Sequence, residues 1–163
     1  MSETFNQKLI IIVGSPCVGK TTVANRLWRS YKNTAYLDDD WVWRVKPFIM
    51  NDPRNRNAHK NSTFVLSTYL KSNFDYVIFS SARMMYPPNR KSLLKNITAK
   101  NYETIGFTLT CSEKTLTERH KKRGDAGEVS FEWLYNRYPD DFVINTDDKT
   151  VTQIVKEIKN IIG

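Results

Sequence analysis

The sequence predicts an α/β fold whose parallel sheet is covered by helices on both faces. Short apolar runs alternate along its 163 residues with longer segments in which apolar residues recur at helical spacing. Strands that alternate with helices form right-handed β-α-β units, and such units produce parallel strands. The length fits one domain, which we expect to span residues 1–163.

The first half of the chain supplies three of the expected strands. Leu9-Ile10-Ile11-Ile12-Val13 is continuous and β-branched, which is typical of a strand buried on both faces. Val23, Leu27 and Tyr31 then recur at the spacing of one helical face. In order, we expect a strand at 9–13, a helix at 19–31, a strand at 34–38, a helix at 56–72 and a strand at 76–79.

The second half continues the alternation. Ser112 is a good N-cap for a helix that runs to about Arg123. The last segment repeats Val and Ile at helical spacing from Val151 to Ile162, which predicts the apolar face of a closing helix. In order, we expect a helix at 89–99, a strand at 105–111, a helix at 112–123, a strand at 142–144 and a helix at 151–162.

Composition narrows the functional classes. The net charge of +8 favours anionic ligands, including nucleotides and nucleic acid, although a solvated basic surface explains it equally well. Cys17, Cys111, His59 and His120 lack the short spacings of a zinc site. The first eight residues lack the apolar stretch of a secretory signal, and no apolar run is long enough to cross a bilayer. We therefore expect a cytoplasmic protein without a membrane span.

The segment GSPCVGKT, at 14–21, matches the phosphate-binding pattern G-x-x-x-x-G-K-[ST] in full. Glycines let successive backbone N–H groups point at phosphate oxygens, and the following helix adds its positive N-terminal end. Lys20 would reach the β- and γ-phosphates, and the Thr21 hydroxyl would ligate Mg²⁺. The expected nucleotide-binding residues are Gly14, Ser15, Pro16, Cys17, Val18, Gly19, Lys20, Thr21 and Thr22.

With this loop and the strand–helix rhythm, the chain resembles the small P-loop kinases of the nucleoside-monophosphate-kinase type. Within that group it is most similar to the gluconate, shikimate and chloramphenicol kinases. The resemblance implies a three-layer P-loop NTPase fold with a five-stranded parallel sheet in the order 2-3-1-4-5. It also implies a small lid after the fourth strand, at about 119–138, and ATP and Mg²⁺ as cofactors.

Three aspartates follow the second expected strand. Alternation along a strand would place Asp38 and Asp40 on one side and Asp39 on the other. The pair resembles the family's D-x-D, whose carboxylates hold a magnesium-bound water and the acceptor hydroxyl, so Asp38 is also a metal candidate. One of the two would take the hydroxyl proton. The other interpretation is that the aspartates solvate a turn and begin a helix.

The resemblance also places the acceptor site next to this cluster. Trp41 and Arg44 follow directly, and they would contact the acceptor together with Asp40; Trp41 and its neighbour Trp43 are equally well explained as core residues of a short helix. After the third strand the chain has Ser80-Ser81-Ala82-Arg83, where many P-loop enzymes carry an aspartate. This segment resembles that of gluconate kinases, so Arg83 is either an acceptor contact or a surface arginine.

Arg119 and Arg123 are four residues apart and fall on one helical face. Their spacing resembles the family's R-x-x-x-R, whose arginines close over the phosphates and spread transition-state charge. Arg137 is a weaker candidate for the same role, and Asn145-Thr146-Asp147 would contact adenine. A solvated basic helix is the alternative for the arginine pair.

We therefore expect an enzyme that uses Mg-ATP to phosphorylate a small-molecule acceptor, such as a nucleoside, a nucleotide or a sugar-like hydroxyl. Its catalytic residues would be Lys20, Asp38, Asp40, Arg119 and Arg123. A regulatory NTPase is disfavoured, because the guanine-specific N-K-x-D segment and the third-strand aspartate are both absent. A 5′-hydroxyl nucleic-acid kinase is the second alternative, motivated by the basic charge. The sequence does not indicate an oligomeric state.

Overall fold

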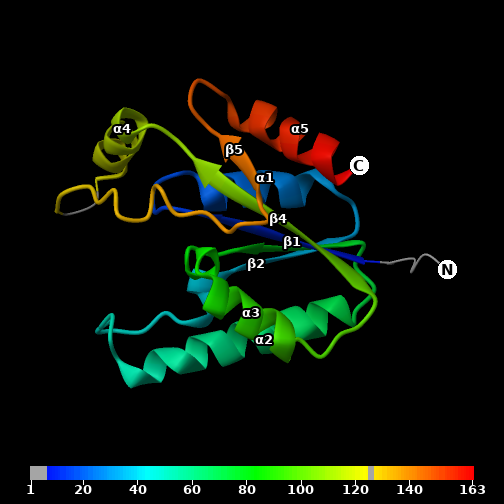
Figure 1. Cartoon of the computed structure of the whole chain (residues 1–163). Helices are drawn as coiled ribbons and strands as arrows, with labels where there is room; N and C mark the ends of the chain where they lie inside the picture. Colours follow the sequence, from blue (N-terminus) through cyan, green and yellow to red (C-terminus); the bar gives the residue numbers. More distant parts are fainter. Residues whose placement is uncertain (1–6, 125–126) are drawn as a thin grey trace.

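The computed structural model describes residues 7–124 and 127–163. Strands and helices alternate through almost the whole of this range (Figure 1). The strands are β1 (Gln7–Gly14), β2 (Thr34–Asp38), β3 (Tyr76–Ser80), β4 (Tyr102–Thr110) and β5 (Phe142–Asn145). The helices are α1 (Lys20–Ser30), α2 (Arg56–Leu70), α3 (Pro87–Asn96), α4 (Glu113–Arg123) and α5 (Val151–Ile162), with short 3-10 turns at Asp39–Val42, Pro53–Asn55 and Arg83–Met85.

All paired strands run parallel, in the order β2-β3-β1-β4-β5, which confirms the predicted sheet. β1 lies at the centre, and its apolar run is completely buried, as a strand covered on both faces requires. The carboxyl ends of the strands meet at one edge of the sheet. The loop after β1 and the acidic residues after β2 therefore lie at the same edge, where ligands of such sheets bind.

Two helical layers cover the sheet (Figure 1). α1 and α5 pack on one face, where Ile10, Leu27 and Ile158 belong to one apolar core. α2 and α3 pack on the other face, where Ile11, Leu66 and other apolar residues form the second core. The three-layer arrangement agrees with the fold expected from the sequence.

Local signals fix the ends of the later helices. Ser112 accepts a hydrogen bond from the backbone N–H of Thr115, as an N-cap should. α5 begins with a capping box, in which Thr150 and Gln153 each bind the other's backbone N–H. α3 begins at Pro87, two residues before the expected start, because proline fits the first turn of a helix, where no N–H is needed.

A buried ion pair fastens the segment after α4 to the sheet. Arg90 of α3 and Asp141 bind through two hydrogen bonds, and their side chains are 3 % and 1 % exposed. Thr108 also donates to Asp141, and the Tyr138 ring lies 3.7 Å from the guanidinium carbon of Arg90. A Cβ at Gly106 of β4 would collide with the Asp141 carboxylate, which explains the glycine at that position.

Candidate nucleotide-binding site

The loop between β1 and α1 has the curled backbone that the motif predicts. Gly14 and Gly19 have φ angles of 156° and 106°, and Cys17 has a φ of 67°. A Cβ at Gly14 would lie 2.7 Å from Val18 Cγ1 and 2.8 Å from the Leu109 carbonyl oxygen, so no larger residue fits there. α1 begins at Lys20 and leaves its first backbone N–H groups directed at the loop, an arrangement that binds phosphate.

Lys20 lies inside this loop, where its ammonium group donates to the Ser15 carbonyl oxygen at 3.0 Å. Burial lowers the pKa of Lys20 from 10.5 to about 8. The nearby carboxylates of Asp40 and Asp38 raise that pKa, while the charge of Arg123 lowers it further. A polyphosphate would supply the negative charge that the buried ammonium lacks.

Asp38 is the centre of a hydrogen-bond network at the end of β2. Its Oδ2 accepts from the Thr21 hydroxyl at 2.8 Å, from Tyr36 at 3.1 Å and from Ser80 at 3.0 Å. Its Oδ1 accepts from the backbone N–H of Asp40. The carboxylate is thus fixed beside the phosphate-binding loop. Because Asp38 pairs in register with Ser80, β2 supplies a carboxylate next to the position at which β3 lacks one.

The two flanking aspartates lie in different surroundings. Asp39 is buried, and it accepts from Ser62, from Ser81 and from both Nε and Nη2 of Arg83 at 2.8 Å. Asp40 is exposed, and desolvation together with the charges of Asp38 and Asp39 raises its pKa, against the opposing charges of Lys20 and Arg123. β2 ends at Asp38, so a 3-10 turn rather than strand alternation separates these side chains. The predicted grouping agrees with these contacts, because Asp38 and Asp40 both act on Lys20 whereas Asp39 binds Arg83. Only the expected cause, strand alternation, is wrong.

The arginines of the predicted lid have different partners. Arg119 donates to the Val18 carbonyl oxygen at 3.0 Å and to the Thr146 hydroxyl at 2.9 Å, so it joins the phosphate-binding loop to the segment after β5. Arg123 contacts Cys17 Sγ at 3.6 Å, and its charge affects both Lys20 and Asp40. Arg137 is exposed. The expected lid, 119–138, includes residues 125–126, which lie outside the described range.

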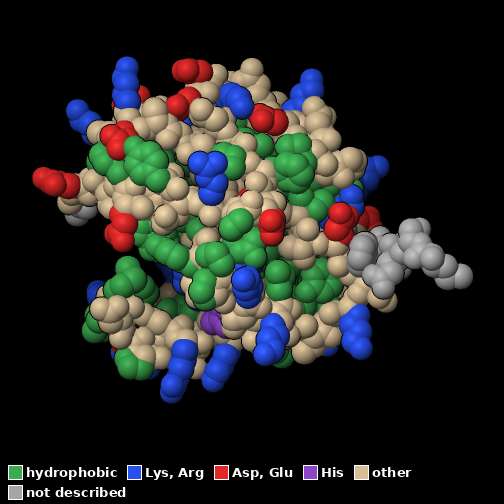
Figure 2. Space-filling model, viewed as in Figure 1, with side chains coloured by type: hydrophobic (Ala, Val, Ile, Leu, Met, Phe, Trp, Pro, Cys, Tyr) green, Lys and Arg blue, Asp and Glu red, His purple; other side chains and the backbone are tan. Residues whose placement is uncertain are grey.

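Two of the expected acceptor residues, Trp41 and Arg44, are exposed and lie just before or within segment 43–55, which borders a cleft. Trp41 is 53 % exposed and meets the Tyr36 ring edge-on at 4.9 Å, and Arg44 is exposed. Trp43 instead donates to Asn55 and so fastens the loop that follows the aspartates. The cleft, a hollow at the left of Figure 2, lies between segments 43–55 and 127–138. Arg83 is held by Asp39 on the α2 side.

The sequence analysis missed the partners of the acidic cluster. Tyr36 precedes Asp38 by two residues in β2, and residues two apart share one side of a strand, so this contact was readable from the sequence. The pairing of Arg83 with Asp39 had no such local signal, because 44 positions separate them. Within residues 7–124 and 127–163, no group of three His, Cys, Asp or Glu side chains could hold a metal, and no helix is long and apolar enough to span a membrane.

The oxygen donors nevertheless fit Mg²⁺. The Thr21 hydroxyl and the Asp38 carboxylate lie 2.8 Å apart beside the phosphate-binding loop. Mg²⁺ prefers oxygen ligands and is commonly held by one or two protein groups together with substrate phosphates and water. A cage of three protein side chains is therefore not needed at this position.

The parallel sheet and the loop at 14–21 together define a P-loop NTPase. The chain belongs to the AAA domain family, which it matches over residues 9–134. A search of curated proteins finds no match.

Solved structures of two kinases and of an antibiotic resistance protein share the fold. An APS kinase from Mycobacterium tuberculosis, solved with AMPPNP and APS, is 15 % identical with a TM-score of 0.71, covering 96 % of this chain and 98 % of that one. The tunicamycin resistance protein of Deinococcus radiodurans is 16 % identical with a TM-score of 0.70, covering 96 % of both chains. A gluconokinase from Sinorhizobium meliloti is 14 % identical with a TM-score of 0.62, covering 94 % and 89 %. The predicted resemblance to small P-loop kinases is confirmed at the level of the fold.

Proposed function

We propose that this protein transfers the γ-phosphoryl group of Mg-ATP to a hydroxyl or phosphate of a small-molecule acceptor, such as a nucleoside, a nucleotide or a sugar-like compound. The observation that carries the proposal is the hydrogen bond from Thr21 to Asp38. This bond joins the phosphate-binding loop to the acidic cluster. The γ-phosphate of a bound triphosphate would therefore lie beside carboxylates that can orient or deprotonate an acceptor hydroxyl. Kinases of the same fold supply the class of reaction.

The nucleotide would be held by segment 14–22. Backbone N–H groups and the Lys20 ammonium would neutralise the phosphates. Thr21 and Asp38 would hold Mg²⁺, which when bound draws negative charge away from the phosphate oxygens. Arg123 lies close enough to Lys20 to affect its pKa, so it would add positive charge near the transferred group. Arg119 would position the loop rather than contact the phosphates, because its donors are directed at Val18 and Thr146.

The carboxylates of Asp38 and Asp40 would have separate roles. Asp38 is fixed by four hydrogen bonds and would hold Mg²⁺, so it is poorly suited to take a proton. Asp40 is exposed and its pKa is raised, which suits a general base. As the acceptor oxygen bonds to the γ-phosphorus, Asp40 would take the hydroxyl proton and the bond to the β–γ bridging oxygen would break, releasing ADP. Trp41 and Arg44 would contact the acceptor at the cleft mouth.

A screen for ADP release tests the proposal. Nucleosides, nucleotides, sugar acids and aminoglycosides would be assayed with Mg-ATP, and an active acceptor would then be used with variants. We expect Lys20→Ala to abolish transfer and Asp40→Asn to lower kcat by about 10²–10⁴-fold with little change in the KM for ATP. Asp148→Asn, an exposed aspartate distant in sequence from the cluster, is the matched control. Rapid ATP hydrolysis that no acceptor stimulates would instead indicate an NTPase.

A further inference from the structure

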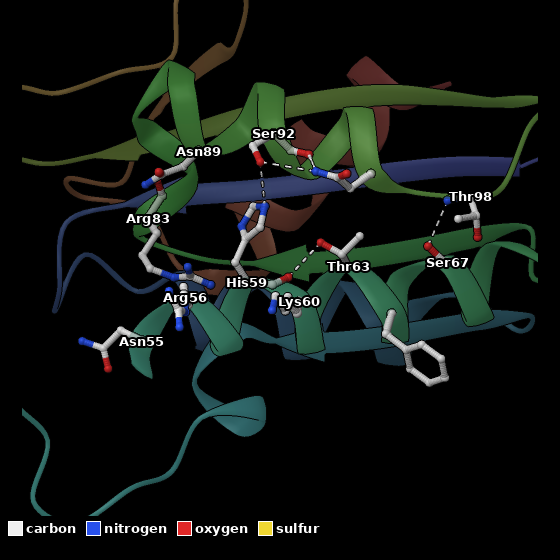
Figure 3. A pocket seen from close by; sticks show the side chains of 12 residues that line it. Asn55, Arg56, His59, Lys60, Thr63, Ser67, Arg83, Asn89, Ser92 and Thr98 are labelled. Atoms are coloured by element: carbon white, nitrogen blue, oxygen red, sulfur yellow. Dashed lines mark hydrogen bonds between the residues drawn. The ribbon is translucent and has the colours of Figure 1, made fainter. Parts of the chain in front are cut away.

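A groove runs between α2 and α3 on the outer side of these helices. Its volume is about 760 Å³, and polar side chains from both helices line it (Figure 3). His59 of α2 reaches across to the Ser92 hydroxyl at 3.1 Å. Burial lowers the pKa of His59, and the charge of Arg83 lowers it further. The groove therefore offers uncharged hydrogen-bonding groups along its floor at neutral pH.

The positive charge of the whole chain is concentrated around this groove. Residues 53–100 contain nine Lys and Arg but a single acidic residue, Asp75, whereas the rest of the chain contains sixteen basic and sixteen acidic residues. Arg54, Arg83 and Arg90 of this segment pair with Asp52, Asp39 and Asp141 outside it, which leaves six basic residues against Asp75. Figure 2 shows Lys and Arg side chains along the lower edge of the molecule, over α2 and α3. This asymmetry is what a surface that binds a polyanion requires.

Cations at one end of the groove are available to a ligand. Arg56 and Lys60 line the groove and are exposed, and within the described part of the chain neither forms an ion pair with a carboxylate. Phe64 also lines the groove, and its side chain is 74 % exposed. An exposed aromatic ring beside unpaired cations is the combination with which proteins stack bases and bind the backbone of a single strand.

The shape of the charged surface favours an extended anion over a compact one. The groove follows α2 from Arg56 to Ser67, which is about 17 Å at 1.5 Å per residue. The phosphates of an extended single strand lie about twice as far apart as the 3.4 Å per strand of a duplex, so this length accommodates about two or three of them. Lys71, Lys91, Lys95 and Lys100 are exposed and belong to the same basic segment, although none of them lines the groove.

The groove also adjoins the acidic cluster. Arg83 lines the groove and binds Asp39 with two hydrogen bonds, and Asp39 lies in the chain between Asp38 and Asp40. A strand bound along α2 would therefore have one end beside the Arg83–Asp39 pair, and Asp39 is next in the chain to the proposed base. We propose that this groove binds the backbone of a single-stranded nucleic acid and presents its 5′ hydroxyl as the phosphoryl acceptor. The acceptor role extends the function proposed above from a free nucleoside to the 5′-terminal nucleoside of a strand and rests on that function, whereas strand binding does not.

Binding would be measured first, without nucleotide, by fluorescence anisotropy of 12-residue single-stranded DNA and RNA that carry a 3′ label and a free 5′ hydroxyl. We expect micromolar affinity at 50 mM salt and a strong salt dependence. Arg56→Gln/Lys60→Gln should weaken binding at least tenfold and flatten the slope of log K against log salt by about 1.4, since each phosphate contact contributes about 0.7. Phe64→Ala should weaken it about fivefold or more.

The matched control is Lys32→Gln/Lys156→Gln, which removes the same charge from exposed positions outside the basic segment. This pair should change affinity less than twofold. Equal losses in the two double variants would mean that net charge alone attracts the strand, and would overturn the proposal. Undetectable binding at 50 mM salt would also overturn the proposal. If AMP displaced the labelled strand at the same concentration as unlabelled strand does, the groove would be a site for a compact anion, and the proposal would again be overturned.

Transfer is tested separately. With Mg-ATP, the wild-type protein should phosphorylate the 5′-hydroxyl strand but not its 5′-phosphorylated form, and the groove double variant should raise the KM for the strand more than it lowers kcat. Lys20→Ala should bind the strand normally and transfer nothing. If the protein phosphorylates a small molecule but does not bind the strand, the proposal that the groove binds nucleic acid is refuted and the proposed kinase function is retained. Strand binding without transfer to any acceptor overturns the kinase and the acceptor role, but not the binding groove.

Discussion

Nucleotide binding should draw a proton onto Lys20. In the free protein burial lowers the pKa of this ammonium to about 8, from 10.5. Each pKa unit corresponds to about 1.4 kcal/mol, so burial disfavours the charged form by about 3 kcal/mol. Phosphate oxygens beside the ammonium should reverse that shift. At pH 8.5 about three quarters of the Lys20 side chains are neutral before binding, and almost all should be charged afterwards.

Calorimetry in buffers with different ionisation enthalpies measures this uptake. Titration of Mg-AMPPNP at pH 8.5 should give a slope of about 0.75 proton, and at pH 7 a slope of about 0.1. The affinity should fall about 30-fold between pH 7 and pH 9.5. Lys20→Arg is the control, because a guanidinium remains charged throughout this range and its variant should take up no proton. A zero slope for the wild-type protein at pH 8.5, or an equal slope for Lys20→Arg, would refute the reasoning.

The lowered pKa of Lys20 also predicts how the stability of the free protein changes with pH. Because the folded pKa of Lys20 lies below its unfolded value, the unfolded chain binds more protons between about pH 8 and pH 10.5. The contribution of Lys20 to the free energy of unfolding should therefore increase with pH across that window. Urea titrations of the wild-type protein and of Lys20→Met should diverge with pH there and run in parallel below pH 7.

Three further predictions concern other residues of the fold and the site. The raised pKa of Asp40 should shift the acid limb of kcat/KM above the usual aspartate range, and Asp40→Asn should remove that limb from the pH profile. Iodoacetamide should modify the partly exposed Cys17 faster than the buried Cys111, and Mg-ATP should slow that modification at least tenfold, as peptide mass spectrometry would measure. Asp141→Asn should lower the free energy of unfolding by about 3–5 kcal/mol in urea titrations, because it leaves buried Arg90 without its counter-charge; a loss below about 1 kcal/mol would contradict this account.

The elements that the sequence predicted well are those with strong local patterns. The buried run of β1, the motif at 14–21 and the apolar face of α5 each depend on residues close together in the chain. The strand order needed the family resemblance, because periodicity does not say which strands pair. The start of β4 at Tyr102, three residues before the expected start, had no apolar signal, since its first residues are half-exposed.

The candidate site was harder to predict because its contacts join distant segments. Arg119 binds Val18, which lies 101 positions earlier. The prediction that Arg119 and Arg123 close over the phosphates came from their helical spacing and the resemblance to the family's R-x-x-x-R. In the structure the two arginines have different partners, because three hydrogen bonds direct the Arg119 guanidinium toward the loop and Thr146. Residues on one helical face can therefore have different partners when the face spans a boundary between two loops.

No aspartate directly follows β3 in this chain, and the neighbouring strand β2 supplies the carboxylate near the Thr21 hydroxyl instead. A carboxylate near the Thr21 hydroxyl can come from either strand, because Asp38 of β2 and Ser80 of β3 are paired in register. Ser80 donates to Asp38 and so supports it instead of replacing it. Placing the carboxylate on β2 puts it next in sequence to Asp39 and Asp40, so one short turn joins the phosphate-binding loop, the proposed base and the Arg83 contact of the groove. The absence of an acidic residue after β3 therefore does not argue against phosphoryl transfer in this chain.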